Sequence, residues 1–172
     1  DVTQLKRLVN PRDLSKLVVL DTWILNCDRY RPSKSGGTTR RNYDNVFLSE
    51  EDSPENRWIL KAMDHTHAFA CGSAWTKKLS NISIVQDDGL FGYFPEFSDL
   101  VQKDDVADSV ARLEAISPAE VAGMLARVPQ ELEVSREIAK AIQSLVVDRA
   151  KYVASSIANR IWKQRSLFGD SQ

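Results

Sequence analysis

The chain has 172 residues and a mass of 19.4 kDa, which is enough for one domain to bury a hydrophobic core without disulfide support. Its composition, 42% apolar and 27% charged, excludes the fibrous and intrinsically disordered classes. The net charge of -1 excludes a global field that would recruit nucleic acid or an anionic membrane.

The chain contains no export signal and no apolar run of the roughly 18 residues that a membrane span requires. We therefore expect a single cytoplasmic domain over residues 1–172 that binds neither membranes nor nucleic acid directly. Two cysteines, Cys27 and Cys71, are too few for a disulfide framework, and we expect both to be reduced thiols.

The first expected element is a helix that starts near residue 10. Asn10 is a typical N-cap and Pro11 suits the first helical position. Residues that would share one face of a helix then recur at three- and four-residue spacing, and all but Asp21 are apolar: Leu14, Leu17, Val18, Asp21, Ile24 and Leu25. This pattern predicts a helix that ends just before Asn26, Cys27 and Asp28.

A basic segment follows over residues 29–44. It contains five basic residues and no acid between Arg29 and Arg41, and its centre, residues 33–39, is Ser-Lys-Ser-Gly-Gly-Thr-Thr. Such a segment has little apolar surface to pack, so we expect a mobile surface loop. Its basic side chains also suit phosphate groups or an acidic partner, and its hydroxyls suit phosphorylation in cis.

Two short apolar runs, residues 45–48 and 57–63, flank a polar turn and predict a β-hairpin. A second pair of runs, Ile82–Val85 and Leu90–Phe94, surrounds Asp87-Asp88-Gly89. That pattern fits either a second small hairpin or an extended loop.

The C-terminal half has helical patterns. We expect helical segments over 97–101 and 110–116, and a helix that begins at Ser117 with a capping box completed by Glu120. A long apolar stripe predicts a terminal helix from about Ser135 to Trp162. The expected fold class is therefore α+β and predominantly α-helical, with a small β-hairpin.

Three polar side chains stand where the hairpin joins its neighbours. Asp28 follows the first helix, Asn45 begins the first strand and Asp64 follows the second strand. Phosphoryl transfer from ATP needs one carboxylate near the attacking hydroxyl, together with an amide and a second carboxylate that hold Mg²⁺. The three residues therefore form a candidate site at one edge of the hairpin.

Three motifs in this order resemble the HipA-like kinases, which belong to the phosphatidylinositol-kinase-like branch of the protein-kinase fold. The motifs are Asn-Cys-Asp-Arg-Tyr at 26–30, Asn-Val-Phe-Leu at 45–48 and Met-Asp-His-Thr-His-Ala-Phe at 63–69. The family pattern reads Asn-x-Asp-Arg-His-x-x-Asn-x-Leu, followed by a strand and Asp-His-Gly. The resemblance extends roughly from Asn10 to Trp162 and implies a protein-kinase-like C-terminal lobe whose hairpin carries the active-site residues.

The resemblance also implies roles. Asp28 would be the catalytic base, while Asn45 and Asp64 would bind Mg²⁺ and, through it, ATP. The sequence departs from the family at three points. Asp28 and Asn45 are seventeen residues apart where the family has five, which makes Asn42 a rival for Asn45; Tyr30 replaces His; and Thr66 replaces Gly.

The Gly-rich loop and the phosphate-pairing lysine of a kinase belong to its N-terminal lobe, and these 172 residues contain neither. The resemblance therefore implies a C-terminal lobe that lacks its ATP-clamping partner lobe and is inactive alone. With that lobe or a partner subunit, the expected reaction is ATP- and Mg²⁺-dependent phosphoryl transfer to a hydroxyl, most simply on a protein.

Alternatives of other classes fit the same residues. Asp28, Asn45 and Asp64 also suit a helix cap, a turn and a strand end. The chain would then be a non-catalytic helical interaction module or a pseudokinase-like fragment.

The histidines and cysteines near the motifs are residue types that can bind a metal or act as nucleophiles, but their pattern supports neither role. His65, His67 and Cys71 lack the paired spacing of zinc sites, and the resemblance gives His65 a structural role beside Asp64. Cys27 is a poor nucleophile because the neighbouring carboxylate of Asp28 opposes thiolate formation.

Overall fold

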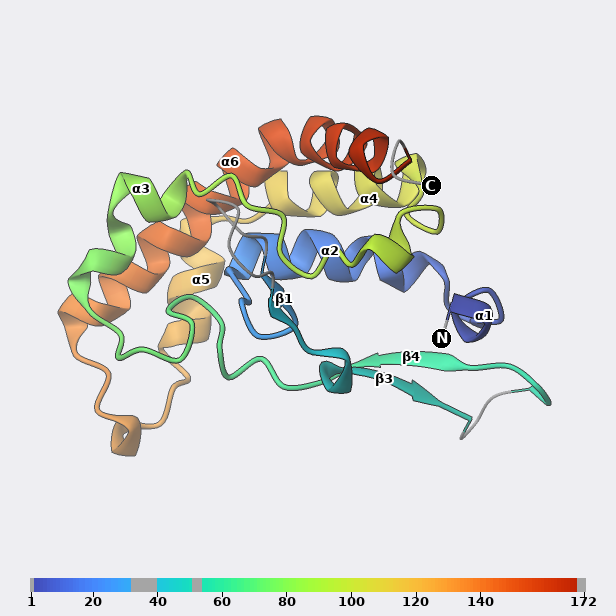
Figure 1. Ribbon diagram of the computed structural model, residues 1–172. Coiled ribbons are helices and arrows are strands. Elements are labelled where there is room, and N and C mark those ends of the chain that lie inside the picture. Colours follow the sequence, from blue (N-terminus) through green and yellow to red (C-terminus); the bar gives the residue numbers. More distant parts are fainter. Residues whose placement is uncertain (1, 32–39, 51–53, 170–172) are drawn as a thin grey trace.

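The computed structural model describes residues 2–31, 40–50 and 54–169 (Figure 1). The helices are α1 (Val2–Leu5), α2 (Arg12–Ile24), α3 (Ile82–Val85), α4 (Lys103–Glu114), α5 (Pro118–Leu125) and α6 (Arg136–Gly169). The strands are β1 (Tyr30–Arg31), β2 (Arg40–Arg41), β3 (Val46–Ser49) and β4 (Ile59–Ala62), in two antiparallel pairs. The fold is thus α+β and mostly helical, which confirms the expected class at that level.

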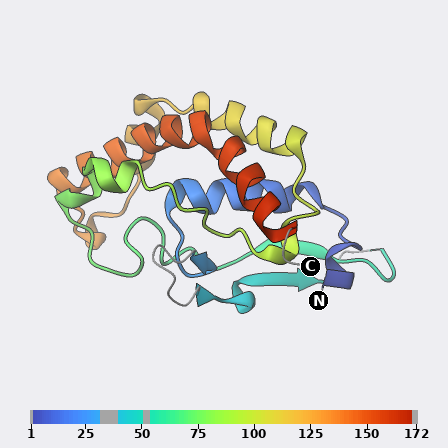
Figure 2. The same cartoon turned by 45° about the horizontal axis from the view of Figure 1, so that its top comes forward.

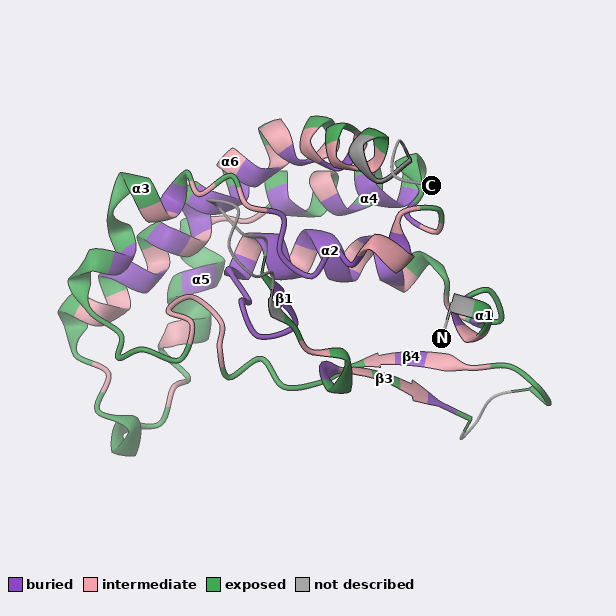
Figure 3. Cartoon of the chain, viewed as in Figure 1, coloured by how far each residue is buried: buried purple, intermediate pink, exposed green. Residues whose placement is uncertain are grey.

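The core lies between α2, α4 and α6, which contact one another pairwise. Figure 1 shows these helices stacked on one side of the β3–β4 hairpin, and Figure 2 shows the same arrangement after rotation. Their facing sides are buried in Figure 3 and their outer sides exposed. The buried apolar side chains come from all three helices and from the segment before α4: Leu14, Val18, Tyr93, Phe94, Val106, Val153, Ile157 and Ile161.

Helix α2 begins at Arg12, close to the expected position, and buries the predicted face. Asn10 does not cap it with its side chain. The Asn10 side chain instead pairs with both backbone groups of Leu60 in β4, at 2.8 and 3.0 Å, and donates to Asp13 Oδ2. The expected N-cap therefore joins α2 to the hairpin.

The two ends of the basic segment 29–44, which the sequence predicts to be a mobile loop, form secondary structure. Tyr30 pairs with Arg41 and Arg31 with Arg40, and a 3-10 turn spans Tyr43–Asn45. The rings of Tyr30 and Tyr43 both pack against Phe94, with centroids 5.2 and 5.0 Å away. These two tyrosine rings supply apolar contacts that the polar and basic composition of the segment did not predict. The central residues, 32–39, lie outside the described residues.

The β3–β4 hairpin is confirmed. Val46 pairs with Ala62 and Leu48 with Leu60, and Val46, Leu48 and Leu60 pack against the core, whereas Ala62 at the end of β4 is exposed. Phe47 and its partner Lys61 lie on the opposite face of the hairpin. Alternation with period two therefore gives the hairpin an inner and an outer face.

The possible second hairpin is wrong. Ile82–Val85 forms the short helix α3, and residues 90–94 contain no strand. The guanidinium of Arg149 explains the choice, because it donates to the carbonyl oxygens of Ile84, Val85 and Asp87 at 2.9–3.1 Å. Carbonyls that end a helix need such donors, so a side chain 62 to 65 residues away stabilises the helical turn.

The same Arg149 guanidinium closes the end of α2. Its Nε and Nη2 donate to the carbonyl oxygens of Thr22 and Trp23, and the residue is fully buried. Burial lowers the pKa of this guanidinium to about 10. The partial negative charge at the C-terminus of α2 offsets part of the cost of burying the cation.

The remaining C-terminal elements agree partly with expectation. The capping box of Ser117 and Glu120 opens α5, and α6 extends beyond the predicted terminal helix. The segment 97–101 is not helical, because only the 3-10 turn Pro95–Phe97 forms there and α4 starts at Lys103. Within the described ranges, none of the helices combines the length and apolarity that a membrane crossing requires.

Candidate functional site

The end of α2 presents the first candidate residue. Leu25 adopts a left-handed conformation (φ 56°), and its N–H and that of Asn26 both donate to the Asp21 carbonyl. This turn ends the helix and directs the chain into Asn26-Cys27-Asp28, as the sequence predicted. Asp28 is only 5% exposed.

Asp28 contacts Asn45 directly. Asp28 Oδ2 accepts a hydrogen bond of 2.7 Å from the Asn45 side-chain amide, and a longer one of 3.3 Å from Asn42. Asp28 and Asn45 are therefore in contact although seventeen residues separate them in sequence. Of the two asparagines that could be the metal-binding amide, Asn45 makes the shorter bond to Asp28. Asn42 has a second task, since its side-chain oxygen caps the 3-10 turn by accepting from the N–H of Asp44 at 3.2 Å.

Arg29 connects all three motifs from within the core. Its fully buried guanidinium donates to the Asn45 carbonyl at 3.0 Å and to the Met63 carbonyl at 2.6 Å. Met63 directly precedes Asp64. One side chain next to Asp28 thus holds the start of β3 and the end of β4 at the same point.

Asp21 balances the charge of Arg29. Both Asp21 oxygens accept from Arg29 Nη1, at 2.6 and 2.7 Å, and neither side chain is exposed. Burial raises the pKa of the Asp21 carboxyl, while Arg29 and the Asn26 amide oppose that change. Gly92 (φ 67°) lies against this carboxylate so closely that an added Cβ would overlap it. The packing therefore requires glycine at position 92.

Asp64 is exposed and held in a left-handed conformation (φ 52°) just after β4. Its Oδ1 accepts from the Thr66 hydroxyl at 2.5 Å and from the Thr66 N–H at 3.1 Å. These bonds lower the pKa of the Asp64 carboxyl. The side chain is therefore ionised at neutral pH and accessible to a cation.

Asn45 and Asp64 lie at the same end of the hairpin. The last pair of the β3–β4 ladder is Val46 with Ala62, so Asn45 precedes it and Asp64 follows it by two residues. The Asn45 amide nitrogen is used by Asp28, which leaves its amide oxygen for a metal. Amide and carboxylate oxygens suit Mg²⁺, which commonly binds through one or two carboxylates and keeps several waters.

No group of three or more His, Cys, Asp or Glu side chains in the described parts of the chain is arranged to hold a metal ion. The donor set at the hairpin end is of a different kind, because it consists of one amide and one carboxylate. Such a set fits a magnesium ion whose other ligands are phosphate and water.

Cys27 and Cys71 form a disulfide, which corrects the expectation of two reduced thiols. Their Cα atoms are 5.5 Å apart, near the commonest separation for disulfides, although 44 residues separate them in sequence. The bond joins the residue before Asp28 to the segment after Asp64. The Phe69 N–H also donates to the Ile24 carbonyl at 2.6 Å, so this segment is attached to the end of α2 twice.

The two histidines have different surroundings. His65 is exposed, and its ring makes no hydrogen bond within the described residues, so the expected supporting contact is not found. His67 instead faces the site, with Nδ1 3.8 Å from Asp28 Oδ2 and 3.3 Å from Thr66 Oγ1.

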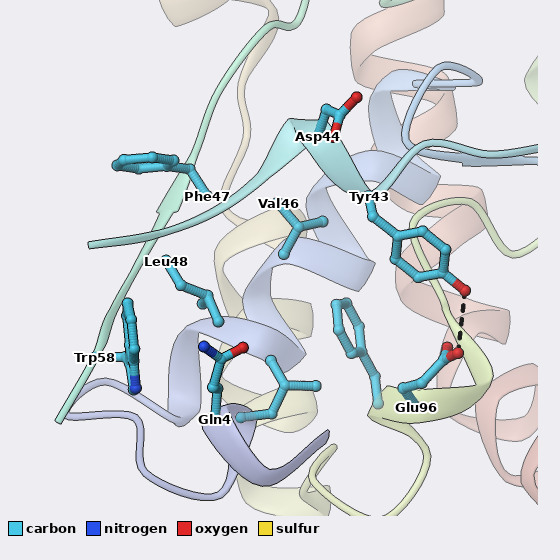
Figure 4. Close-up of a pocket in the computed structure, with 10 residues that line it drawn as sticks. Gln4, Tyr43, Asp44, Val46, Phe47, Leu48, Trp58 and Glu96 are labelled. Atoms are coloured by element: carbon cyan, nitrogen blue, oxygen red, sulfur yellow. Dashed lines mark hydrogen bonds between the residues drawn. The ribbon is translucent and has the colours of Figure 1, made fainter. Parts of the chain in front are cut away.

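A pocket of about 740 Å³ lies under the hairpin beside Asn45 (Figure 4). Val46 and Leu48 point into it from β3, Trp58 closes one side, and Tyr43 donates to Glu96 Oε1 at 3.0 Å on the other. Phe47 points away from Val46 and Leu48 and is 46% exposed. The outer face of the hairpin therefore carries an exposed aromatic ring two residues from Asn45.

Sequence reasoning missed three residues of this site. Arg29 was treated as one of several surface cations, although its place directly after the motif aspartate Asp28 was a signal that it belongs to the site. Phe47 could have been found from period-two alternation, which must turn one of Val46, Phe47 and Leu48 outward. His67 gave no local signal, since its contact with Asp28 spans 39 residues.

Comparison of the chain with models of known protein families, with curated proteins and with solved structures gave no match.

Proposed function

We propose that the chain is the catalytic-loop lobe of a kinase-like enzyme that transfers the γ-phosphoryl group of ATP to a hydroxyl on a protein. Asp28 is the base that accepts the proton of the attacking hydroxyl. Asn45 and Asp64 hold Mg²⁺ and, through it, the phosphates. These roles follow the resemblance of the three motifs to the HipA-like kinases.

The observation that carries the proposal is the direct contact of Asp28 with Asn45 at 2.7 Å. A base and a metal ligand must be neighbours if the hydroxyl is to attack a metal-bound phosphate. The Arg29 guanidinium supports the same arrangement, because it bonds to the carbonyls of both Asn45 and Met63.

The ionisation of Asp64 supports its assignment as a metal ligand. The Thr66 bonds favour the ionised form of its carboxyl and lower its pKa, and its position outside the core leaves room for hydrated Mg²⁺. Bound Mg²⁺ would neutralise charge on the phosphates and orient them. The chain itself supplies the oxygen ligands, the base and the rigid hairpin that fixes their spacing.

Phe47 is the natural surface for the nucleotide base. It projects from the outer face of β3, two residues after Asn45, where one apolar ring is nearly half exposed. Stacking of a base on an aromatic ring contributes about 1–3 kcal/mol. The other side of the base and the phosphate-pairing lysine would come from an N-terminal lobe or a partner subunit.

The test is phosphoryl transfer from radiolabelled ATP by the native full-length polypeptide, with Mg²⁺ and a mixture of protein acceptors. Asp28→Asn should lower kcat by at least about 100-fold and leave the nucleotide KM nearly unchanged, since a general base contributes about 10²–10⁴-fold. Asp64→Asn should abolish transfer, because it weakens the binding of Mg²⁺. Phe47→Ala should raise the nucleotide KM, and Ile82→Ala, a remote exposed site, should not.

A non-catalytic interaction module is the second candidate. An apolar groove of about 390 Å³ between α5, α6 and the segment around Trp75 favours it, with Met124 67% exposed at its edge. This candidate predicts that Asp28→Asn and Asp64→Asn leave the biological activity unchanged while Met124→Glu removes it.

A further inference from the structure

His67 occupies a place between the proposed base and the proposed metal ligand. Its Nδ1 lies 3.3 Å from the Thr66 hydroxyl and 3.8 Å from Asp28 Oδ2. The Thr66 hydroxyl donates to Asp64 Oδ1 at 2.5 Å. Because that hydroxyl proton is directed at Asp64, the Thr66 oxygen is an acceptor for His67 in the tautomer that carries its proton on Nδ1. A donor chain therefore runs from His67 through Thr66 to Asp64.

The ring is held in place by its surroundings. A Cβ at Gly72 would come within 2.9 Å of His67 Cδ2 and 3.0 Å of Nε2, so the ring occupies the space that glycine leaves. Gly72 also has φ 77°, a conformation that glycine adopts without strain. The Cys27–Cys71 disulfide joins the segment from His67 to Gly72 to the turn that carries Asp28. The position of the ring is thus set by the fold.

Asp28 Oδ2 has three nitrogen neighbours: the amides of Asn45 and Asn42 and the ring of His67. The two amides come from the segment that leads into β3, whereas His67 comes from the segment after β4. His67 is the one neighbour of the three that is also linked to Asp64. His67 therefore lies against the proposed base on one side, at 3.8 Å, and is linked through the Thr66 hydroxyl to the proposed metal ligand on the other.

Resting on the proposed function, we propose that His67 is a positioning residue that fixes the Asp28 carboxylate relative to Asp64 through Thr66. It takes no part in proton transfer and contacts neither nucleotide nor acceptor. Its loss should therefore lower turnover through misalignment and leave nucleotide binding intact. Loss of such an orienting partner typically costs about 10- to 100-fold.

The variants that test this inference distinguish the loss of the His67 hydrogen-bond donor from the loss of the bulk of its ring. His67→Asn retains a donor near the position of Nδ1, while His67→Leu retains bulk without a donor. Thr66→Ser keeps the hydroxyl and Thr66→Val removes it. We expect His67→Leu and Thr66→Val to lower kcat in the native polypeptide about 10- to 100-fold with nucleotide KM within about twofold. His67→Asn and Thr66→Ser should recover most of the loss.

A second measurement is independent of catalysis. The side-chain amide of Asn45 donates to Asp28, so its proton resonances report the orientation of that carboxylate in the 172-residue chain. His67→Leu should shift these resonances, and His67→Asn should restore them. Equal kcat in wild type and His67→Leu would overturn the inference. If the wild type transfers no phosphate, the proposed function fails instead, and unchanged Asn45 resonances in His67→Leu would then overturn the role of His67.

Discussion

The side chains of Asp28 and Asn45 meet in a hydrogen bond of 2.7 Å although seventeen residues separate them. The two ends of the intervening segment lie side by side, because Tyr30 pairs with Arg41 and the Asn42 N–H donates to the Arg29 carbonyl at 2.8 Å. The length of the intervening segment therefore does not set the distance between the two side chains.

The two asparagines beside Asp28 should differ in function. Asn45→Ala should raise the Mg²⁺ concentration needed for half-maximal phosphoryl transfer at least about tenfold, because it removes a proposed metal ligand as well as a hydrogen bond to the proposed base, Asp28. Asn42→Ala removes only the 3.3 Å bond and the cap of a short turn, so its effect on Mg²⁺ should be within about threefold. Magnesium titrations of the two variants measure the difference. Equal Mg²⁺ requirements would identify Asn42 as an equivalent ligand.

The buried pair of Arg29 and Asp21 should dominate the stability of the site. Arg29→Met leaves the buried carboxylate of Asp21 uncompensated and removes the donor to the carbonyls of Asn45 and Met63, which should lower the free energy of unfolding by about 3–5 kcal/mol. Urea denaturation measures this loss. The partly exposed pair of Lys16 and Asp13 is the control, and Lys16→Met should cost at most about 1 kcal/mol. A loss for Arg29→Met no larger than that of the control would show that the pair does not stabilise the fold.

The disulfide between Cys27 and Cys71 predicts one linked product on trypsin digestion. Without reduction, the peptide 17–29 should be joined to the peptide 62–77, and a dithiol should separate them with the gain of two hydrogens. Cys71→Ser should lower the free energy of unfolding under non-reducing conditions by about 2–4 kcal/mol, because the bond closes a long loop. Alkylation of both thiols in the unreduced native protein would contradict this pairing.

The Asp64 carboxyl should titrate below its ordinary value of 3.8, because Thr66 donates two hydrogen bonds to its ionised form. With the pKa lowered on folding, the stabilisation is present above that ordinary value and is lost as the pH falls through the folded pKa. Carbon-detected NMR titration of the side chain measures the midpoint. Thr66→Val should raise it and Thr66→Ser should not. An identical midpoint in Thr66→Val would mean that the hydroxyl does not hold the carboxylate.

Local pattern predicted much of the fold and failed where distant side chains decided the outcome. The capping box at Ser117, the hairpin and the terminal helix all depend on neighbours within a few residues or on simple periodicity. The run Ile82–Val85 has β-branched residues typical of a strand, yet Arg149 stabilises it as a helical turn through three carbonyls. No local signal at residues 82–85 reveals that donor.

In the candidate site, too, local motifs predicted some residues, whereas contacts between distant segments determined others. The motifs gave Asp28, Asn45 and Asp64, and the hairpin register explains why the latter two share one end. The contact between His67 and Asp28 depends on the backbone turns at Phe69, Cys71 and Gly72, all with positive φ. Phe69 and Cys71 are not glycine, so at these two positions the sequence contains no signal for a left-handed turn.

The most direct test of the account asks whether Asp28, Asn45 and Asp64 form one metal and phosphate site. Mn²⁺ with ATP at millimolar concentration broadens the NMR signals of nearby groups, even when the 172-residue chain binds nucleotide weakly. We predict selective broadening of the Asn45 side-chain amide and of the backbone amides of Asp28 and of residues 63–66, and its loss in Asp64→Asn. Uniform broadening, or broadening of the same signals in Asp64→Asn, would contradict the proposed site.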